Sequence, residues 1–238
     1  FMHLNKMPVP KVFAILVNGS LMNENYQTIQ LIQLKEYKDY FVKEINGECG
    51  EKVKNIKNYE HLVEYLNSIG KNDVIFQEKI IQHHELNRLN SRCVNTIRMV
   101  TVRNGESDPV VFGAILRVGT EKSLERDNTS QGGIAIGIND DGMLMEYGVR
   151  KPQYGGRIRI HPDSKIVFKE FKVPYYKEAV ELACKAHRML YRMASIGWDI
   201  AITETGAVFV EGNDNWELQT IQAIFGGQRR RCKELLEN

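Results

Sequence analysis

Three oxygen-bearing side chains stand at the ends of a predicted hairpin near the end of the chain. The segment Trp198–Asn213 reads WDIAITETGAVFVEGN, two short apolar strands around a Thr205-Gly206 turn. The start of one hairpin strand lies beside the end of the next, so Asp199, Glu211 and Asn213 are expected at one rim. Such hard oxygen donors suit Mg²⁺, which proteins hold through one or two carboxylates together with substrate phosphates. An ordinary polar sheet end is the alternative interpretation.

A lysine near two glycines in the first third of the chain suggests phosphate binding. Lys43 lies on a predicted strand just before a loop that contains Gly47 and Gly50. Glycines let backbone N–H groups approach phosphates closely, and the lysine supplies a point charge beside them. A surface turn is the alternative, and the spacing differs from the GxxxxGK[ST] pattern of a P-loop.

A third polar group follows a short buried strand. In FQEKIIQHHEL, residues 76–86, the strand ends at Gln77-Glu78, where backbone groups can meet an adenine edge. Glu85 lies seven residues after Glu78 and offers a carboxylate to ribose hydroxyls. An exposed, charged helix start is the alternative for Glu85.

Two lobes are predicted to position these groups, with their junction near residues 77–82. Residues 1–78 form a compact α+β lobe with strands expected over 11–17, 28–34, 40–45 and 74–77. Asn58 caps a predicted helix over 59–68, which ends at Gly70.

Residues 79–238 are predicted to form a larger, strand-rich lobe. Strands are expected over 96–103, 110–118, 133–138 and 143–149, followed by the hairpin that contains Asp199. The longest helix is expected over 174–193, with Pro174 in its first turn, and a short helix over 215–225.

The composition narrows the function classes. The chain has 238 residues, 42% of them hydrophobic and 26% charged, which is ordinary for a globular protein. Its formal net charge of +2 is too small and dispersed to favour nucleic acid as a partner. No apolar run approaches the roughly 18 residues that span a bilayer. Four scattered cysteines without a CxxC pair indicate free thiols in a reducing compartment, and hence a cytoplasmic location.

Taken together, the chain resembles the ATP-grasp superfamily, and most of all its sugar-transfer-associated members. The nucleotide and metal motifs occur in that family's order, and the likeness covers nearly the whole chain. Further familiar segments are VNTIRMVT (94–101), LRVG (116–119), DNTSQGGI (127–134), HPD (161–163), GWDIAIT and VEGN.

The resemblance implies an α+β fold in which two lobes enclose a nucleotide beneath a glycine-rich lid loop. It implies that Lys43 and the Gly47/Gly50 loop bind the ATP phosphates. At the Gln77-Glu78 hinge, Glu78 and the backbone of Lys79 would hold the adenine. Glu85 would hold the ribose. Asp199, Glu211 and Asn213 would hold Mg²⁺ against the β- and γ-phosphates.

Family members usually carry a further region before the first strand found here. This chain opens with Phe1-Met2 and enters a strand almost at once. We therefore expect a segment to precede it.

Arginines are the candidates for stabilising charge during phosphoryl transfer, which needs alignment and positive charge more than covalent help. Arg98 and Arg117 lie on neighbouring predicted strands, and if these strands pair, both can face the nucleotide. Structural salt bridges are the alternative. Many ATP-grasp ligases place an arginine just before the metal-binding aspartate, whereas Gly197-Trp198 stands there in this chain.

Candidate substrate contacts come from the remaining polar motifs. Asn128 and the Gly132-Gly133 pair are expected to form part of an acceptor pocket. The remaining candidates are His161, Asp163 and Gln219.

The resemblance predicts an ATP- and Mg²⁺-dependent ligase that joins a carboxylate to an amine through an acylphosphate. Surface polysaccharide synthesis is the expected context, with sugar-linked substrates and glycosyltransferase partners. A small-molecule or sugar kinase on the same fold, and a non-catalytic nucleotide- or partner-binding module, remain alternatives. No Ser/His/Asp or Cys/His arrangement supports hydrolysis through a covalent nucleophile.

Overall fold

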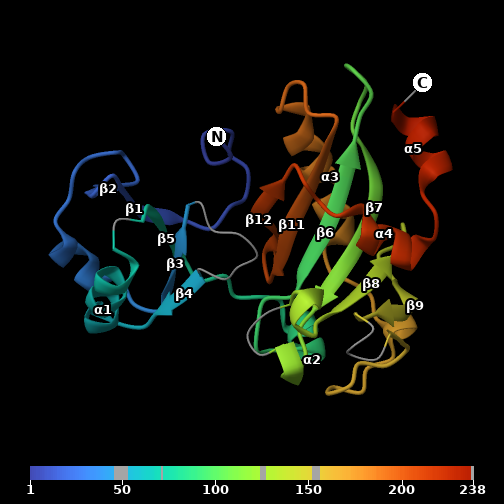
Figure 1. Ribbon diagram of the computed structural model, residues 1–238, viewed down its shortest axis with the longest axis horizontal. Coiled ribbons are helices and arrows are strands. Elements are labelled where there is room, and N and C mark those ends of the chain that lie inside the picture. Colours follow the sequence, from blue (N-terminus) through green and yellow to red (C-terminus); the bar gives the residue numbers. More distant parts are fainter. Residues whose placement is uncertain (46–52, 71, 124–126, 152–155, 237–238) are drawn as a thin grey trace. The chain divides into compact units, whose positions relative to one another are not determined.

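Two compact units make up the chain (Figure 1). The computed structural model describes residues 1–45, 53–70, 72–123, 127–151 and 156–236. The smaller unit is Pro10–Ile80, and the larger unit combines Phe1–Val9 with Ile81–Asn238. Within the described residues, each unit pairs an antiparallel sheet with a few helices, which confirms the predicted α+β class.

The first nine residues belong to the larger unit, although the predicted division gives residues 1–78 to the smaller lobe. Met7 is apolar and only 3% exposed, and it packs into the main core of the larger unit. The backbone N–H of Phe209 donates to the carbonyl of Pro8 at 2.9 Å. A buried side chain and a backbone hydrogen bond therefore tie this segment to a strand two hundred residues away.

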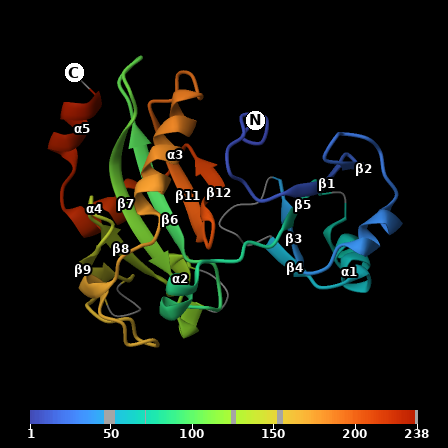
Figure 2. The ribbon, with the colours of Figure 1, turned by 180° about the vertical axis from the view of Figure 1, so that it is seen from behind.

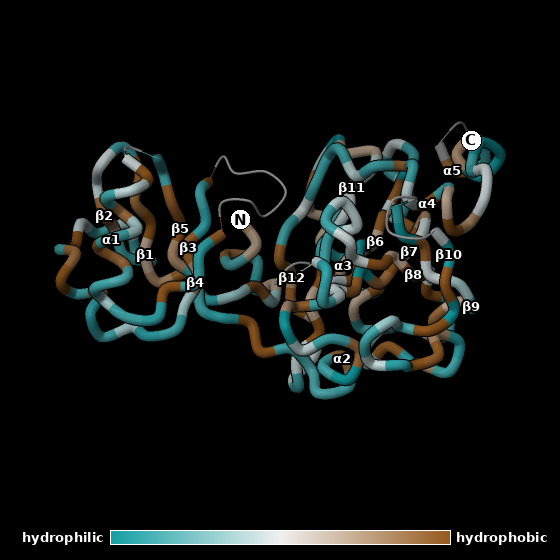
Figure 3. The backbone as a smooth tube through the Cα atoms, turned by 60° about the horizontal axis from the view of Figure 1, so that its bottom comes forward, coloured by the Kyte–Doolittle hydropathy of each residue, from teal (hydrophilic) through white to brown (hydrophobic). Residues whose placement is uncertain are grey.

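The smaller unit is built on a five-stranded antiparallel sheet in the order β2-β1-β5-β3-β4. Alternate residues of β3 and β5 are buried, and Figure 3 shows hydrophobic stretches along β1, β3 and β5. Helix α1 begins after Asn58, whose side chain accepts from the His61 N–H, and ends at Gly70, as predicted. The elements are β1 (Val12–Val17), β2 (Ser20–Asn23), η1 (Leu31–Glu36), β3 (Tyr40–Glu44), β4 (Val53–Ile56), α1 (Tyr59–Ile69) and β5 (Val74–Glu78).

One predicted strand of this unit is wrong. Residues 28–34 were expected to be extended, but a 3₁₀ helix runs over Leu31–Glu36. The Gln33 side chain accepts from the backbone N–H of Gln30 at 2.8 Å and so closes the first turn. Only Leu34 of this helix is buried, because a short helical turn needs to place just one side chain in the core.

The larger unit is built on a seven-stranded sheet in the order β10-β9-β8-β7-β6-β11-β12, with every neighbouring pair antiparallel. All the strands predicted for this lobe are present. They are β6 (Thr96–Val102), β7 (Val110–Val118), β8 (Ile134–Ile138), β9 (Leu144–Val149), β11 (Ser195–Thr203) and β12 (Gly206–Asn213). The two-residue strand β10 (Arg157–Ile158) was not predicted. The short connecting elements are α2 (His84–Leu89), η2 (Glu121–Ser123), η3 (Thr129–Gln131) and η5 (Phe168–Glu170).

Helices cover both faces of this sheet (Figure 2). Helix α3 (Tyr176–Arg188) packs on one face against a core that includes Ile97, Met99 and Leu116. Helices α4 (Leu218–Phe225) and α5 (Arg229–Leu236) cover part of the other face, over Val100, Val102 and Phe112. The same face also carries the polar residues of the candidate site.

Helix α3 is shorter than predicted. It was expected over 174–193, but Tyr175 precedes its first residue with a left-handed φ of 51°, which keeps Pro174 outside the helix. At the other end, Met189 closes the helix by donating its N–H to the carbonyl of Ala186. Within the described residues, none of the helices has both the length and the apolar character needed to traverse a lipid bilayer.

Candidate functional site

The strand register brings two of the predicted metal ligands and both predicted catalytic arginines to one face of the larger sheet. Asp199 of β11 pairs with Glu211 of β12 on one side and with Arg98 of β6 on the other. One step along, Thr96 of β6 pairs with Arg117 of β7. Residues that pair directly across antiparallel strands point to the same face, so these five side chains share a surface.

A β-bulge makes this arrangement compatible with the core. Asp199 pairs with Glu211 and Ile200 pairs with Phe209, so β12 carries one extra residue, Val210. Phe209 is 4% exposed and belongs to the core on the α3 side. Phe209 and Glu211 are two apart in the sequence, so on a regular strand without a bulge both would point to that buried face. The bulge therefore keeps Phe209 in the core and Glu211 with Asp199.

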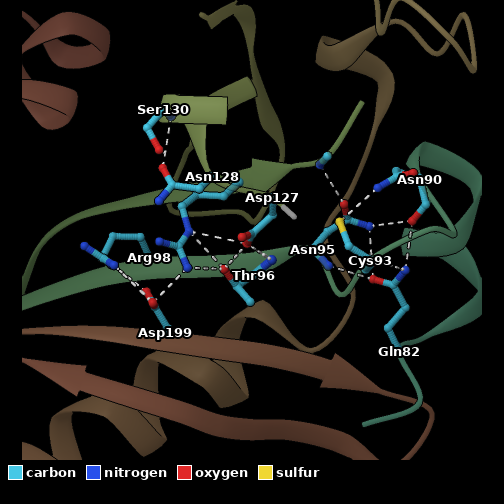
Figure 4. A network of polar contacts seen from close by, with 12 residues as sticks. Gln82, Asn90, Cys93, Asn95, Thr96, Arg98, Asp127, Asn128, Ser130 and Asp199 are labelled. Carbon is cyan, nitrogen blue, oxygen red and sulfur yellow. Dashed lines mark hydrogen bonds and ion pairs between the residues drawn. The ribbon is translucent and has the colours of Figure 1, made fainter. Parts of the chain in front are cut away.

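Asp199 is held by two arginines (Figure 4). Its oxygens accept from Nε and Nη2 of Arg98 at 2.5 and 3.0 Å, a bidentate contact, and from Nη2 of Arg117 at 2.8 Å. Its side chain is 6% exposed, whereas the two arginine side chains are 15% and 16% exposed. Buried carboxylates are tolerated when they are paired in this way.

The electrostatics of the group favour the charged forms. Burial on its own raises the pKa of the Asp199 carboxyl, but Arg117 and Arg98 outweigh it and hold that pKa below its ordinary value of 3.8. Burial likewise lowers the pKa of Arg117, and the charges of Asp127, Asp199 and Glu211 raise it above its ordinary value. Asp199 and Arg117 therefore form a charged pair at neutral pH.

Asp127 and Thr96 complete the group, although neither was predicted as a site residue. The Thr96 hydroxyl donates to Oδ2 of Asp127 at 2.5 Å and accepts from Nη2 and Nε of Arg117 at 2.7 and 3.0 Å. Oδ2 of Asp127 also lies 3.4 Å from Nε of Arg117. The available signals were Thr96, two residues before Arg98, and Asp127, which opens the motif DNTSQGGI.

A second polar network lies directly beside the charged one (Figure 4). Asn95 is fully buried and donates to Oε1 of Gln82 and to the carbonyls of Leu86 and Asn90, while its Oδ1 accepts from the Gly119 N–H. Nε2 of Gln82 donates to three oxygens of the same segment. This neutral network fixes the segment around α2 to the start of β6.

The predicted metal ligands differ in their availability. Both oxygens of Asp199 accept from arginines, so a cation there would have to replace a guanidinium. Within the described residues, Glu211 is exposed and accepts no hydrogen bond, and Asn213 uses only its amide nitrogen, in a 3.4 Å contact with the Gly197 carbonyl. Two carboxylates and an amide oxygen are the donor types that Mg²⁺ prefers, so the residues fit this ion.

The smaller unit presents its predicted nucleotide residues on one sheet face. Lys43 of β3 pairs with Ile75 of β5, and Phe41 pairs with Gln77. All four are half-buried, whereas the apolar neighbours Tyr40, Val42, Val74 and Phe76 are buried in the core on the opposite face. Lys43 and Gln77 thus share a partly apolar face. Gly47 and Gly50 lie outside the described residues.

The strand end after Gln77 is held within the smaller unit. The Glu78 side chain accepts from the Lys11 N–H at 2.7 Å, and Nζ of Lys79 lies 2.9 Å from the Asp39 carboxylate. In the larger unit, Glu85 lies in the first turn of α2 and accepts from Nη1 of Arg88 at 2.6 Å. The adenine and ribose roles of these residues stay predictions.

A profile of the sugar-transfer-associated ATP-grasp family matches residues 1–233. The chain belongs to this family. The match confirms the resemblance carried by the motifs, and no curated protein matched the sequence.

Solved structures agree with an ATP-grasp fold. The chain is similar to carboxyaminoimidazole ribonucleotide synthase from Aspergillus clavatus, crystallised with ATP, at a TM-score of 0.54 and 9% identity over 90% of this chain and 42% of that one. It is similar to the Thermotoga maritima N5-carboxyaminoimidazole ribonucleotide synthetase, at a TM-score of 0.53 and 14% identity over 99% of this chain and 47% of that one. It is also similar to a biotin carboxylase–β-γ-ATP complex from Campylobacter jejuni, at a TM-score of 0.53 and 11% identity over 93% of this chain and 40% of that one. The chain therefore spans less than half the length of these proteins.

In this ATP-grasp protein the predicted acceptor motif forms a tight turn. Asn128 caps η3 by accepting from the Ser130 N–H, and Gly132 follows with a left-handed φ of 100°. A Cβ on Gly133 would lie 2.3 Å from the carbonyl oxygen of Asp127, so only glycine fits there. The turn thereby sets the position of Asp127, and the substrate contacts of Asn128, Gly132 and Gly133 stay predictions.

The HPD motif supports a neighbouring loop. His161 is fully buried; its Nε2 contacts the Gly119 carbonyl at 3.0 Å, and its Nδ1 accepts from the N–H groups of Asp163 and Ser164. Burial lowers the pKa of His161 below its ordinary value of 6.5. Asp163 accepts from the Glu121 N–H at 2.8 Å. Both residues are engaged within the fold, and their substrate contacts stay predictions, as does that of exposed Gln219 on α4.

Proposed function

We propose that this chain binds ATP and Mg²⁺ and provides the nucleotide-binding part of a ligase that joins a carboxylate to an amine. The observation that carries the proposal is the register of β11 and β12, which sets Asp199 opposite Glu211 on a sheet face that also holds Arg98 and Arg117. Two carboxylates beside two guanidiniums are what a metal–triphosphate complex requires of a protein.

The assigned roles follow from charge and position. Asp199, Glu211 and Asn213 would hold Mg²⁺, which when bound neutralises charge on the ATP phosphates. Arg98 and Arg117 face the negative charge that builds up on the transferred phosphoryl group. Losing one such donor typically costs about 3 kcal/mol in the barrier. Lys43 would bind the phosphates, and Gln77 lies on the same face of the smaller sheet, where the adenine is proposed to sit.

The proposed reaction has two steps. A carboxylate oxygen attacks the γ-phosphorus of ATP, so that an acylphosphate forms and ADP leaves. The amine nitrogen then attacks the acyl carbon, phosphate leaves with the bonding electron pair, and the nitrogen releases a proton to give the amide. The solved relatives named above include synthetases and a carboxylase, which supports a ligase rather than another ATP-grasp activity.

The biological setting is proposed from the family description. Its sugar-transfer association supports a sugar-linked carboxylate or amine as one substrate and a role in surface polysaccharide synthesis or decoration. Glycosyltransferases of the same pathway are the proposed partners, and ATP consumption favours the cytoplasm.

Hydroxylamine trapping tests this reaction. The chain is incubated with ATP, Mg²⁺, hydroxylamine and a panel of sugar acids and amino acids, and ADP and hydroxamates are measured. We expect ADP release that depends on a carboxylate and yields its hydroxamate, and we expect Glu211→Gln to abolish it. Glu106→Gln, the same change on an exposed loop, is the control. ADP release with a phosphate ester and no hydroxamate would show a kinase instead.

A further inference from the structure

The two arginines that hold Asp199 are anchored differently. Within the described residues, Arg98 has one carboxylate partner, and its remaining contact is a 3.5 Å approach of Nη1 to the carbonyl of Trp216. Arg117 has two carboxylate partners, Asp199 at 2.8 Å and Asp127 at 3.4 Å, and the Thr96 hydroxyl lies between it and Asp127. Only Arg117 therefore has an ion-pair partner that does not depend on Asp199.

This difference matters when the Asp199 carboxylate binds a cation in place of its arginines, as the proposed function requires. Arg98 would then lose both of its short contacts. Arg117 would lose only one, because its Nε still faces Asp127 and its Nη2 still donates to Thr96. Its Nη1 donates to no group in the part of the chain that the structure describes, and so can meet an incoming phosphate.

We propose that Asp127, acting through the Thr96 hydroxyl, is the positioning residue that keeps Arg117 in place when Asp199 binds the metal. The proposal rests on the proposed function of the site. The backbone supports the arrangement at both ends. Oδ2 of Asp127 also accepts from the Thr96 N–H at 3.2 Å, and the turn after Asp127 closes only because residue 133 is glycine. The carboxylate is thus fixed before any ligand arrives, which is how a positioning group works.

Asp127→Asn tests the proposal because it removes the charge but keeps an oxygen of similar size. Arg117 then has Asp199 as its one carboxylate partner, and a metal must compete with the whole guanidinium. The readout is the Mg²⁺ concentration that gives half of the rise in Tm caused by a non-hydrolysable ATP analogue. We expect this concentration to increase about five- to tenfold.

Two comparisons separate positioning from simple support of the fold. Asp108→Asn is the matched control, since Asp108 pairs with Arg188 at 2.6 Å in the loop at the far end of β6; it should leave the Mg²⁺ requirement unchanged. Thr96→Val should reproduce the effect of Asp127→Asn, and Thr96→Ser, which keeps the hydroxyl, should restore the wild-type value. An unchanged Mg²⁺ requirement in Asp127→Asn overturns the proposal.

A ligand-free measurement separates failure of this proposal from failure of the proposed function. The loss of Tm caused by Asp127→Asn is measured in wild-type protein and in the Arg117→Gln background. We expect the second loss to be less than half of the first, because the two residues are coupled. Equal losses would overturn the positioning role. Absence of any analogue-dependent rise in the wild-type Tm would instead overturn the proposed nucleotide site.

Discussion

Two polar networks meet at the start of β6, and they differ in charge: one is neutral and the other is ionic. Asn95 belongs to a neutral network in which amides donate to backbone carbonyls, and its hydrogen-bonding groups are satisfied within the fold. Thr96, the next residue, belongs to a charged network of two arginines and two aspartates. Figure 4 shows the two side by side.

The neutral network serves to hold the fold together, whereas the charged network can exchange its partners for ligands. Replacing a partner in the neutral network leaves a buried donor or acceptor unsatisfied, so that network has one stable arrangement. The side chains of the charged network are 6–16% exposed, whereas Asn95 is fully buried, and a cation and a phosphate that bind together would re-pair the charges that they separate. We infer that the first network fixes the strands and the second responds to ligands.

The largest effect is expected from the neutral network. Asn95→Leu leaves Oε1 of Gln82 and the Gly119 N–H without this partner and should reduce the free energy of unfolding by about 3–5 kcal/mol. Both tryptophans, Trp198 and Trp216, lie in the larger unit, so urea unfolding followed by tryptophan fluorescence reports on it. The exposed member Asn87 is the control, with Asn87→Ala costing about 0.5–1 kcal/mol. Equal costs would remove the distinction between a buried network and an exposed one.

The charged network should tolerate a comparable change better. Asp199→Asn removes the charge shared by Arg98 and Arg117 but leaves an amide oxygen to accept from one of them. We expect a loss of about 2–4 kcal/mol in the same unfolding experiment, because the guanidiniums are only partly buried. If Asp199→Asn lowered the free energy of unfolding more than Asn95→Leu does, the charged network would also be needed to stabilise the fold.

Acid should distinguish the two networks as well. The pKa of Asp199 is lowered in the folded protein from its ordinary value of 3.8, because the arginines outweigh burial. Its stabilising contribution is therefore complete above pH 3.8 and is lost as the pH falls through the folded value. Measured by fluorescence unfolding between pH 5 and 2, wild type should lose more stability than Asp199→Asn. Parallel curves for the two proteins would contradict the assignment.

A smaller pH effect is expected from the loop that His161 supports. Burial lowers the pKa of His161 from its ordinary value of 6.5, so its contribution is complete above pH 6.5 and declines as the pH falls toward the folded value. His161→Gln should flatten the dependence of stability on pH between 7 and 5. His187 has a lowered pKa for the same reason, so the dependence should not vanish in this variant.

Much of the site could be predicted because its pattern is local. Two apolar strands around a Thr205-Gly206 turn determine a hairpin, and the hairpin brings Asp199 to Glu211. The pairing of β6 with β7 was only a condition of the sequence argument, and the structure meets it with Arg98 and Arg117 on one face. The bulge at Val210 was not predicted, and its signal in the sequence is the break in alternation between apolar Phe209 and charged Glu211.

The features that were missed depend on distant contacts. Asp127 reaches Thr96 across 31 residues, and neither residue type alone indicates the pairing. The first nine residues join the larger unit through Met7 and Pro8, a choice that tertiary packing makes. The predicted strand over 28–34 failed for a related reason, because a glutamine pair closed a short helix whose apolar residues suit either state.

The most direct test of the central claim is calorimetric titration with a non-hydrolysable ATP analogue, with and without Mg²⁺. The account predicts Mg²⁺-dependent binding that Glu211→Gln abolishes and Glu106→Gln preserves. Analogue at a hundred times its Kd should also add about 2.7 kcal/mol of stability. Binding that ignores Mg²⁺, or that survives Glu211→Gln unchanged, would contradict a metal–nucleotide site on this sheet face.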